Sequence, residues 1–275
     1  MGELSEFLRS RRARLSPDDA GLGTYGARRR VPGLRREELA QLAGISADYY
    51  VRLEQGRLDN VSDQVLDSVA RALRLDVTEH DHLRSLARPR RRSVAPAAPE
   101  ATVRDTQRWL LDSIAGPAYI LGPRTDVLAW NGLACALYGV ELGALERPNM
   151  ARLIFQDPAA REVWTPWEDK ARDTVGGLRV LAGQYPEDTV LAALLAELAD
   201  DPVFARLWTE HEVWTSPFGA KHFRHPVAGE FTLHYEAFGV PGHPDRTLIT
   251  YSADPRSPAA DALALLGQAR SQRQP

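Results

Sequence analysis

The segment that sets the architecture of the first third of the chain is Leu34-Arg-Arg-Glu-Glu-Leu-Ala-Gln-Leu-Ala-Gly-Ile-Ser-Ala-Asp-Tyr-Tyr-Val-Arg-Leu-Glu-Gln-Gly56. Its apolar spacing predicts helices over 35–43 and 47–55. Gly44 permits the left-handed backbone that a tight turn between them needs, Ile45 can fill the crevice between the helices, and Ser46 is a preferred N-cap. This pattern indicates a helix-turn-helix, in which the first helix braces on a DNA backbone and the second lies in the major groove.

Three further helices are predicted around this segment, over 3–15, 62–73 and 78–87. Together they give an all-α five-helix domain over residues 1–88. Residues 89–101 are rich in Pro, Ala and Arg, which is typical of a semi-extended linker. Residues 102–275 have a different pattern of short strands and helices and are predicted to form a second domain.

The second helix of the predicted helix-turn-helix has two faces. Tyr49, Tyr50 and Leu53 fall on the side toward the core. The other side is expected to approach base edges, and it carries Ala47, Asp48, Val51, Arg52 and Gln55. Arg52 suits bidentate contact with guanine, and a phosphate contact or an ion pair within the protein are equal alternatives. Asp48 either accepts from cytosine or caps the helix, and Glu54 is expected to be structural.

Arginines near the predicted helix ends are candidate phosphate contacts, because loops and helix starts border the groove. The candidates are Arg28, Arg29, Arg30, Arg35 and Arg36. Arg11 and Arg12 on the first predicted helix are weaker candidates. For each arginine taken alone, a solvated surface position is an equal alternative, but the group as a whole is expected to contact DNA.

Charge is distributed unevenly along the chain, whose net charge is −3. Residues 1–92 have 18 Arg and 14 acidic residues, a net charge of +4, which leaves −7 for residues 93–275. A basic module joined to an acidic one is typical of a nucleic-acid-binding domain attached to a domain with another task. Because Lys170 and Lys221 are the only lysines, arginine supplies nearly all of the positive charge.

The second domain is predicted to be α+β, because strands are expected at both of its ends and helices between them. The expected strands span 117–121, 126–130, 221–227, 230–240 and 247–252. The expected helices span 102–115, 131–138, 161–181, 186–200, 202–211 and 259–269. Alternation in 230–240 places Phe231, Leu233, Tyr235 and Ala237 on one face of that strand.

The second domain is rich in aromatic residues, which suit either ordinary core packing or an apolar pocket between sheet and helices. The residues expected to line such a pocket are Trp130, Ala134, Leu137, Phe155, Phe231, Leu233 and Tyr235. A pocket with this lining would take a small hydrophobic ligand.

Signals for other chemistry are weak. His222 and His225 are three residues apart, and residues at that spacing on a strand point to opposite faces, so we expect no metal site. Cys135 is the only cysteine, which excludes an intrachain disulfide, and it is expected to be packed. The sequence has no Walker A, Gly-x-Ser-x-Gly or dinucleotide motif, no signal peptide and no membrane-spanning run. We therefore expect a cytoplasmic protein that is not an enzyme and needs no cofactor.

Residues 34–56 resemble the helix-turn-helix of the xenobiotic-response-element family, which has the lambda-repressor-like fold. The resemblance rests on Glu37-Glu38-Leu39-Ala40, Ala43-Gly44-Ile45-Ser46 and Arg52-Leu53-Glu54-Gln55-Gly56. The arginine-rich connector over 29–38 narrows it to the MmyB-like regulators, and segments within 126–131, 171–179, 207–211, 219–226 and 248–251 are similar to that family's C-terminal domain. One departure is Arg36, since the family often has Gln at this position, and it favours an arginine–phosphate contact.

The resemblance implies a PAS-like second domain that binds a ligand. We therefore expect a transcription regulator that binds double-stranded DNA and responds to a small apolar ligand. A homodimer is expected, because one small helix-turn-helix contacts too few base pairs for strong specificity. Two alternatives stay open: a constitutive DNA-binding regulator whose second domain only dimerises, and a cofactor-using enzyme tethered to DNA.

Overall fold

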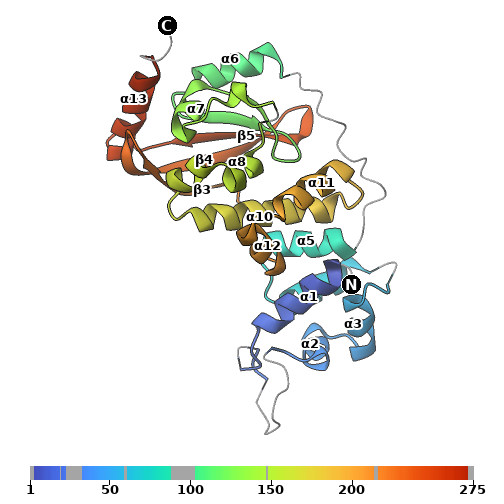
Figure 1. Cartoon of the computed structure of the whole chain (residues 1–275). Coiled ribbons are helices and arrows are strands. Elements are labelled where there is room, and N and C mark those ends of the chain that lie inside the picture. The colour runs from blue at the N-terminus through green and yellow to red at the C-terminus, as the bar shows by residue number, and fades with distance from the viewer. Residues whose placement is uncertain are drawn as a thin grey trace. The chain divides into compact units, whose positions relative to one another are not determined.

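The computed structural model describes residues 3–18, 20–22, 33–58, 61–87, 103–146, 148–213 and 216–271. The chain divides into two compact units (Figure 1). Unit 1 comprises Met1–Ala95, Arg179–Glu187 and Arg206–Trp214, and unit 2 comprises Pro96–Leu178, Asp188–Ala205 and Thr215–Pro275. The predicted linker over 89–101 lies outside the described residues.

Five helices lie within the described residues up to 87, as the sequence predicts. They are α1 (Glu3–Arg14), α2 (Arg36–Ala43), α3 (Ala47–Glu54), α4 (Asp63–Ala72) and α5 (Val77–Ala87). No predicted helix end differs from the observed one by more than one residue. Ser46 and Ser62 each cap the following helix with their side chain, so these starts are set by local sequence.

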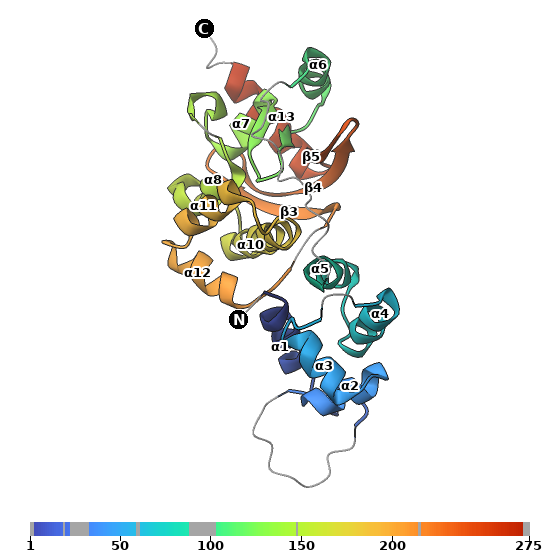
Figure 2. The ribbon, with the colours of Figure 1, turned by 90° about the vertical axis from the view of Figure 1, so that its right-hand side faces the viewer.

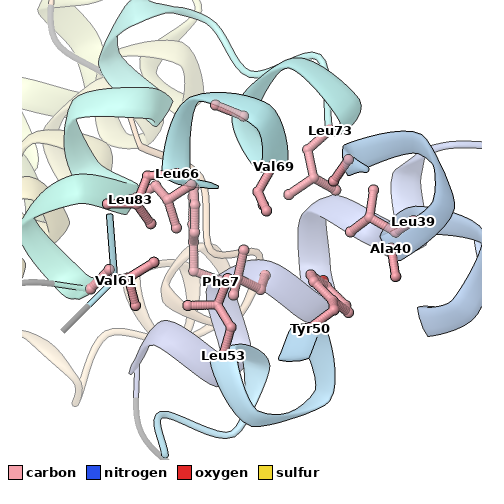
Figure 3. Packing of buried hydrophobic residues seen from close by; sticks show 14 of the residues in the cluster. Phe7, Leu39, Ala40, Tyr50, Leu53, Val61, Leu66, Val69, Leu73 and Leu83 are labelled. Atoms are coloured by element: carbon pink, nitrogen blue, oxygen red, sulfur yellow. The ribbon is translucent and has the colours of Figure 1, made fainter. Parts of the chain in front are cut away.

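The helices of unit 1 enclose an apolar core made by residues at helical spacing. Phe7 of α1, Tyr50 and Leu53 of α3 and Leu83 of α5 are almost completely buried. Figure 3 shows these side chains close together with the other labelled core residues, which are Leu39, Ala40, Val61, Leu66, Val69 and Leu73. Because α1, α2, α4 and α5 all contribute to this core, the orientation of α3 is fixed by the packing of the whole bundle.

The sheet of unit 2 has five antiparallel strands among the described residues, in the order β2-β1-β5-β4-β3. The strands are β1 (Ala118–Leu121), β2 (Val127–Trp130), β3 (Phe218–His225), β4 (Gly229–Val240) and β5 (His243–Ser252). The last strand, β5, pairs with the first, β1, so strands from both ends of the unit form one sheet. The predicted α+β, PAS-like architecture is therefore confirmed.

Helices cover both faces of this sheet. The helical segments in the rest of the chain are α6 (Asp105–Ser113), α7 (Gly132–Tyr138), the 3-10 turn η1 (Leu142–Ala144), α8 (Met150–Gln156), α9 (Pro158–Val163), α10 (Trp167–Gln184), α11 (Thr189–Leu198), α12 (Pro202–Thr209) and α13 (Pro258–Ser271), and those that contact the sheet include α6, α7, α9 and α13. Leu111 of α6 packs with Ile120 and Ala129 on one face. α7 packs against β1, and α13 packs against α7 and β4 (Figure 2).

The structure corrects the sequence prediction between residues 149 and 181. The predicted helix over 161–181 is in fact two helices, since α9 ends at Val163 and α10 begins at Trp167. Pro166 lies between them, and a proline cannot continue a helix hydrogen-bond ladder. α8 was not predicted, although the Asn149 side chain caps it by accepting from two backbone N–H groups.

Asn131 joins three elements of unit 2, and its predicted role as a helix cap is confirmed. Its Oδ1 accepts from the backbone N–H of Ala118 in β1 and of Ala134 in α7, each at 3.1 Å. Its Nδ2 donates to the carbonyl oxygens of Leu111 and Gly116 at 3.1 and 2.7 Å. One buried amide therefore fixes α6, β1 and α7 to one another.

Candidate functional site

The turn before α3 has the geometry that the sequence predicts. Gly44 follows α2 in the left-handed conformation, with φ 66° and ψ 29°. The N–H of Ile45 donates to the carbonyl oxygen of Ala40 at 3.0 Å, and the Ser46 hydroxyl accepts from the N–H of Tyr49 at 3.1 Å. These bonds satisfy backbone groups at the end of one helix and the start of the next, which fixes the angle between them.

α3 has one buried and one exposed face. Tyr50 and Leu53 are buried, whereas Tyr49, which we expected toward the core, is only half-buried. The predicted groove residues lie on the opposite side, where Ala47, Asp48, Arg52 and Gln55 are exposed and Val51 is half-buried. Within the described part of the chain, the side chain of Arg52 has no ion pair or hydrogen-bond partner. Of its three predicted roles, the ion pair within the protein is therefore disfavoured.

Glu54, at the end of α3, is a buried carboxylate held by two arginines. Its side chain is 0% exposed. Arg12 of α1 donates from Nε to Oε2 at 3.1 Å, and Arg36 of α2 donates from Nε to Oε1 at 2.8 Å. Arg12 also donates from Nη1 to the carbonyl oxygen of Leu34 at 2.6 Å. The predicted structural role of Glu54 is confirmed, because it connects α3 to α1 and to the start of α2.

The charge of Glu54 depends on these two arginines. Burial alone would raise the pKa of the carboxyl group, because it penalises the charged form. Hydrogen bonds and charge from Arg12 and Arg36 outweigh that penalty and hold the pKa of Glu54 below its ordinary value. Glu54 is therefore ionised at neutral pH and forms a charge-assisted network with both guanidinium groups.

The phosphate candidates differ in how far they are accessible. Arg35 and Arg36 have side chains that are 41% and 43% exposed, at the start of α2, although Arg36 also binds Glu54. Arg28, Arg29 and Arg30 lie outside the described residues. Arg11 is buried and pairs with Glu79 at 2.7 Å, and Arg12 is engaged as described above. The two weaker candidates are therefore disfavoured, because their side chains are only 3% and 11% exposed and their guanidinium groups bind partners within the protein.

Two exposed residues near α3 were not among the predictions. Arg57 follows the end of α3 and, among the described residues, has no ion pair. Gln41 lies exposed on α2, one turn before Gly44. Their positions next to the two caps could have indicated them, because helix ends in this motif border the groove. We add both to the candidate DNA contacts.

Aromatic residues of unit 2 gather on one face of the sheet. We call this group the aromatic face, and it consists of Tyr119, Tyr138, Trp164, Phe223, Phe231, Tyr235 and Tyr251. Neighbouring ring centroids lie 5.0–6.4 Å apart, distances at which aromatic pairs are stabilising. Burial raises the pKa of Tyr119, Tyr138 and Tyr251 above the ordinary value, so these hydroxyl groups stay protonated and can donate hydrogen bonds.

The predicted pocket residues are partly brought together here. Phe231 and Tyr235 belong to the aromatic face, and Trp130 is opposite Tyr119 across β1 and β2. The other predicted residues are also buried. Ala134 and Leu137 lie on α7, Leu233 lies on β4 and Phe155 lies on α8. Phe155 packs against Trp167 and Phe204, at 5.8 and 5.2 Å. The sequence missed Tyr119, Tyr138 and Tyr251, and the pocket itself stays a prediction.

A cavity of about 710 Å³ opens elsewhere on unit 2, at α8 and α11. Its lining contains none of the predicted pocket residues and consists of Leu145, Glu146, Asn149, Arg152, Leu153, Gln156, Asp157, Pro158 and Glu197. Arg152 binds Glu197 at 2.7 Å, and the Gln156 amide donates to the same carboxylate at 2.8 Å. Because these polar groups satisfy one another, the cavity offers little chemistry to a ligand.

The histidines on β3 do not form a pair. His222 is opposite Thr232 and His225 is opposite Gly229, on different faces of the strand. His225 is buried, with Nε2 at 3.0 Å from the carbonyl oxygen of Ala136 and Nδ1 accepting from the N–H of Val227. Within the described ranges, no cluster of three potential metal ligands is found, and no helix is long and apolar enough to span a bilayer.

Comparisons with known proteins agree with both units. A helix-turn-helix domain model matches residues 3–83. The model of the MmyB-like transcription regulator ligand binding domain matches residues 103–266, which is more than half of the chain. No curated protein matches the chain. The chain therefore belongs to the MmyB-like transcription regulators and is a DNA-binding regulator with an N-terminal helix-turn-helix and a C-terminal ligand-binding domain.

Proposed function

We propose that α3 recognises the operator in the major groove and that a small molecule bound in unit 2 controls this binding. The observation that carries the first part is the exposed polar face of α3, opposite a back that is buried through Tyr50, Leu53 and Glu54. A helix with one face packed into the core and the other face accessible suits base recognition, because its side chains then approach the groove from a fixed position.

Within this interface, Arg52 is the proposed base-reading residue. Its guanidinium is exposed and available, and arginine is the commonest bidentate partner of guanine in the major groove. Arg35 and Arg36, together with Arg28, Arg29 and Arg30, are proposed to bind phosphates and set the register. Ala47 and Val51 offer apolar surface for a thymine methyl group.

The proposed interface is tested with Arg52→Ala on an operator selected from random duplexes by the purified protein. We expect the affinity for that operator to fall about 5- to 150-fold, corresponding to about 1–3 kcal/mol, with relaxed preference at one base position. Arg256→Ala is the matched control, because Arg256 is a 91% exposed arginine of unit 2 whose removal changes the net charge equally. Uniform weakening on all sequences would make Arg52 a phosphate contact, and no change would exclude the proposed face.

Ligand control requires that the ligand bind the DNA-competent and DNA-incompetent states with different affinities. Native mass spectrometry of freshly purified protein, before and after addition of operator, checks this directly. Control by a ligand is supported if a small molecule co-purifies with the protein and the fraction of protein that carries it changes when the operator binds. A protein that binds DNA equally well with and without every retained molecule would be a constitutive regulator.

We also propose that the chain acts as a homodimer on a pseudo-palindromic site. The recognition helix has only eight residues, and one such helix contacts too few base pairs for strong specificity. Sedimentation of the full chain with one duplex tests this. Two chains per duplex are expected, with half-sites about 10–10.5 base pairs or a multiple apart, whereas one chain per duplex at saturation would exclude the dimer.

A further inference from the structure

The two lysines of the chain lie together in unit 2. Lys221 of β3 donates to the carboxylate of Asp173 on α10, and its ammonium lies 5.5 Å from the ring centroid of Tyr235. Lys170, one turn before Asp173 on α10, has its ammonium 5.6 Å from the ring centroid of Trp164. Both lysines therefore border the aromatic face, although arginine supplies the positive charge elsewhere in the chain.

This cluster has more positive than negative charge, and it has more hydrogen-bond donors than acceptors. The charges of Lys170 and Lys221 repel each other, and Asp173 is the carboxylate that interacts with both. Burial and the neighbouring Lys221 lower the pKa of Lys170 to about 8, and Asp173 only partly offsets them. No hydrogen-bond partner for the Lys170 ammonium is found in the part of the chain that the structure describes. An additional anion would compensate the surplus charge.

A neutral donor beside the lysines also lacks an acceptor. The Nε1–H of Trp164 is buried and has no hydrogen-bond partner among the described residues. Tyr138, whose hydroxyl lies among those of Tyr119 and Tyr251, has its ring 5.0 Å from that of Trp164, and both residues are 3% exposed. A buried donor without an acceptor costs about 1–3 kcal/mol. A bound acceptor would remove that cost.

The packing of the aromatic face limits the size of an occupant. Tyr119, Tyr251 and Phe223 are at most 2% exposed and are in continuous ring contact with Tyr138 and Trp164. A long alkyl chain would have to separate several of these rings and lose their contacts. A small planar molecule would disrupt far fewer of these ring contacts, and the aromatic side chains can stack on a ligand ring.

We propose that unit 2 binds a compact organic anion, a carboxylate or phenolate on a single ring, between Lys170 and Lys221. The anionic oxygens accept from the two ammonium groups, and Trp164 supplies a further donor. This inference rests on the proposed ligand control, since it identifies the chemistry of the ligand and the residues that hold it.

The test is titration of the full chain with a series of ring acids, namely benzoate, 4-hydroxybenzoate, phenylacetate and cinnamate, by calorimetry and tryptophan fluorescence. At least one acid is expected to bind, and Lys170→Met and Lys221→Met are each expected to weaken it at least 10-fold. Lys170→Arg and Lys221→Arg keep the charge and are expected to weaken it less. Arg172→Met is the matched control, because Arg172 is a half-buried cation of α10 that pairs with Glu168.

Each other outcome overturns a stated part of the proposal. If no ring acid binds, or if the methionine variants bind as well as the wild type, the site does not exist. Tighter lysine-dependent binding of decanoate would exclude a compact ligand, and equal binding of inorganic phosphate would exclude an organic one. Circular dichroism of the methionine variants verifies that lost binding is not lost folding.

Because the chain has only two lysines, amine acylation followed by mass spectrometry gives a second measurement on the unmodified protein. Acylation of Lys170 is expected to be half-maximal near pH 8 without ligand. A bound anion favours the ammonium form, so the ring acid is expected to slow acylation and shift its half-maximum to higher pH. Unchanged acylation of Lys170 at saturating acid would place the anion elsewhere.

The failure of this site and the failure of ligand control are distinguishable. If a ring acid binds through the lysines but leaves operator affinity unchanged, the site stands and control of DNA binding falls. If operator affinity responds to another molecule equally in the wild type and in both methionine variants, ligand control stands and this site is excluded as its origin.

Discussion

Replacing Glu54 by Gln removes the negative charge at the back of α3 and keeps the size of the side chain. Arg12 and Arg36, which donate to the two carboxylate oxygens, then lose their counter-charge. The amide can accept from one arginine but offers an N–H₂ group to the other. We expect α3 to become less firmly held, with the rest of the unit 1 core unchanged.

The expected cost follows from the burial of the three partners. Breaking a fully buried ion pair on one side costs about 3–5 kcal/mol, because an uncompensated buried charge remains. Here Arg36 is 43% exposed and regains water, whereas Arg12 is 11% exposed and stays desolvated. Only one of the two cations is therefore left in a poor environment, so we expect about 2–3 kcal/mol.

Hydrogen–deuterium exchange of the full chain measures this locally, since it reports the opening free energy of individual segments. A loss of about 2–3 kcal/mol corresponds to an increase in exchange of about 30- to 150-fold for the α3 amides. Glu37→Gln is the matched control, because Glu37 is 68% exposed and lies 3.8 Å from Arg35. A change of less than about 0.5 kcal/mol is expected there.

Acid provides the same perturbation without mutation. The pKa of Glu54 is lowered in the folded state, so its stabilisation is fully present above the unfolded value, about 4.5, and is lost as pH falls through the folded value. The wild type and Glu54→Gln should therefore converge in α3 exchange as pH falls below about 4.5. The argument is wrong if Glu54→Gln protects α3 as well as Glu37→Gln does at neutral pH.

Three further changes test the geometry of the turn and of unit 2. Gly44→Ala should cost about 1–2 kcal/mol in thermal unfolding, because φ is 66° there and no neighbouring atom is in the way; unchanged stability would exclude a left-handed turn. Ser46→Ala should increase exchange at the Tyr49 amide by about 1 kcal/mol through loss of the cap, and Ser46→Asp, which can still cap, should not. Asn131→Ala should cost about 3–5 kcal/mol by leaving buried backbone groups of unit 2 unpaired, and a Tm within 2 °C of the wild type would contradict this role.

The helices of unit 1 could be predicted to within one residue because their limits are local. Ser46 and Ser62 cap the helix that each begins, and Gly44 ends α2, so the signals lie within a few residues of the ends. The exposed face of α3 follows from the same periodicity. What periodicity could not give is the engagement of Arg12, because its partner Glu54 is 42 residues away in the sequence.

Unit 2 was harder because its site depends on pairing between distant strands. Alternation along β4 correctly placed Phe231, Leu233 and Tyr235 on one face. The sequence did not reveal that β5 lies beside β1, and this pairing is what brings Tyr251 within 6.4 Å of Tyr119. Tyrosines on separate strands have no shared local pattern, so the aromatic face could not be predicted from either segment alone.

The two proposed roles of Arg36 are holding α3 through Glu54 and contacting a DNA phosphate. One variant can distinguish them. Its Nε and Nη2 both point to Oε1 of Glu54, at 2.8 and 2.7 Å, while the side chain is 43% exposed. If Arg36 also contacts a phosphate, Glu54→Gln frees a full positive charge at the DNA surface while loosening the recognition helix. Non-specific binding should then strengthen and become more salt-dependent, by up to one unit of slope, while operator affinity falls. If Arg36 only holds α3, operator affinity falls and the salt slope on random DNA stays as in the wild type, so the two measurements together assign the residue.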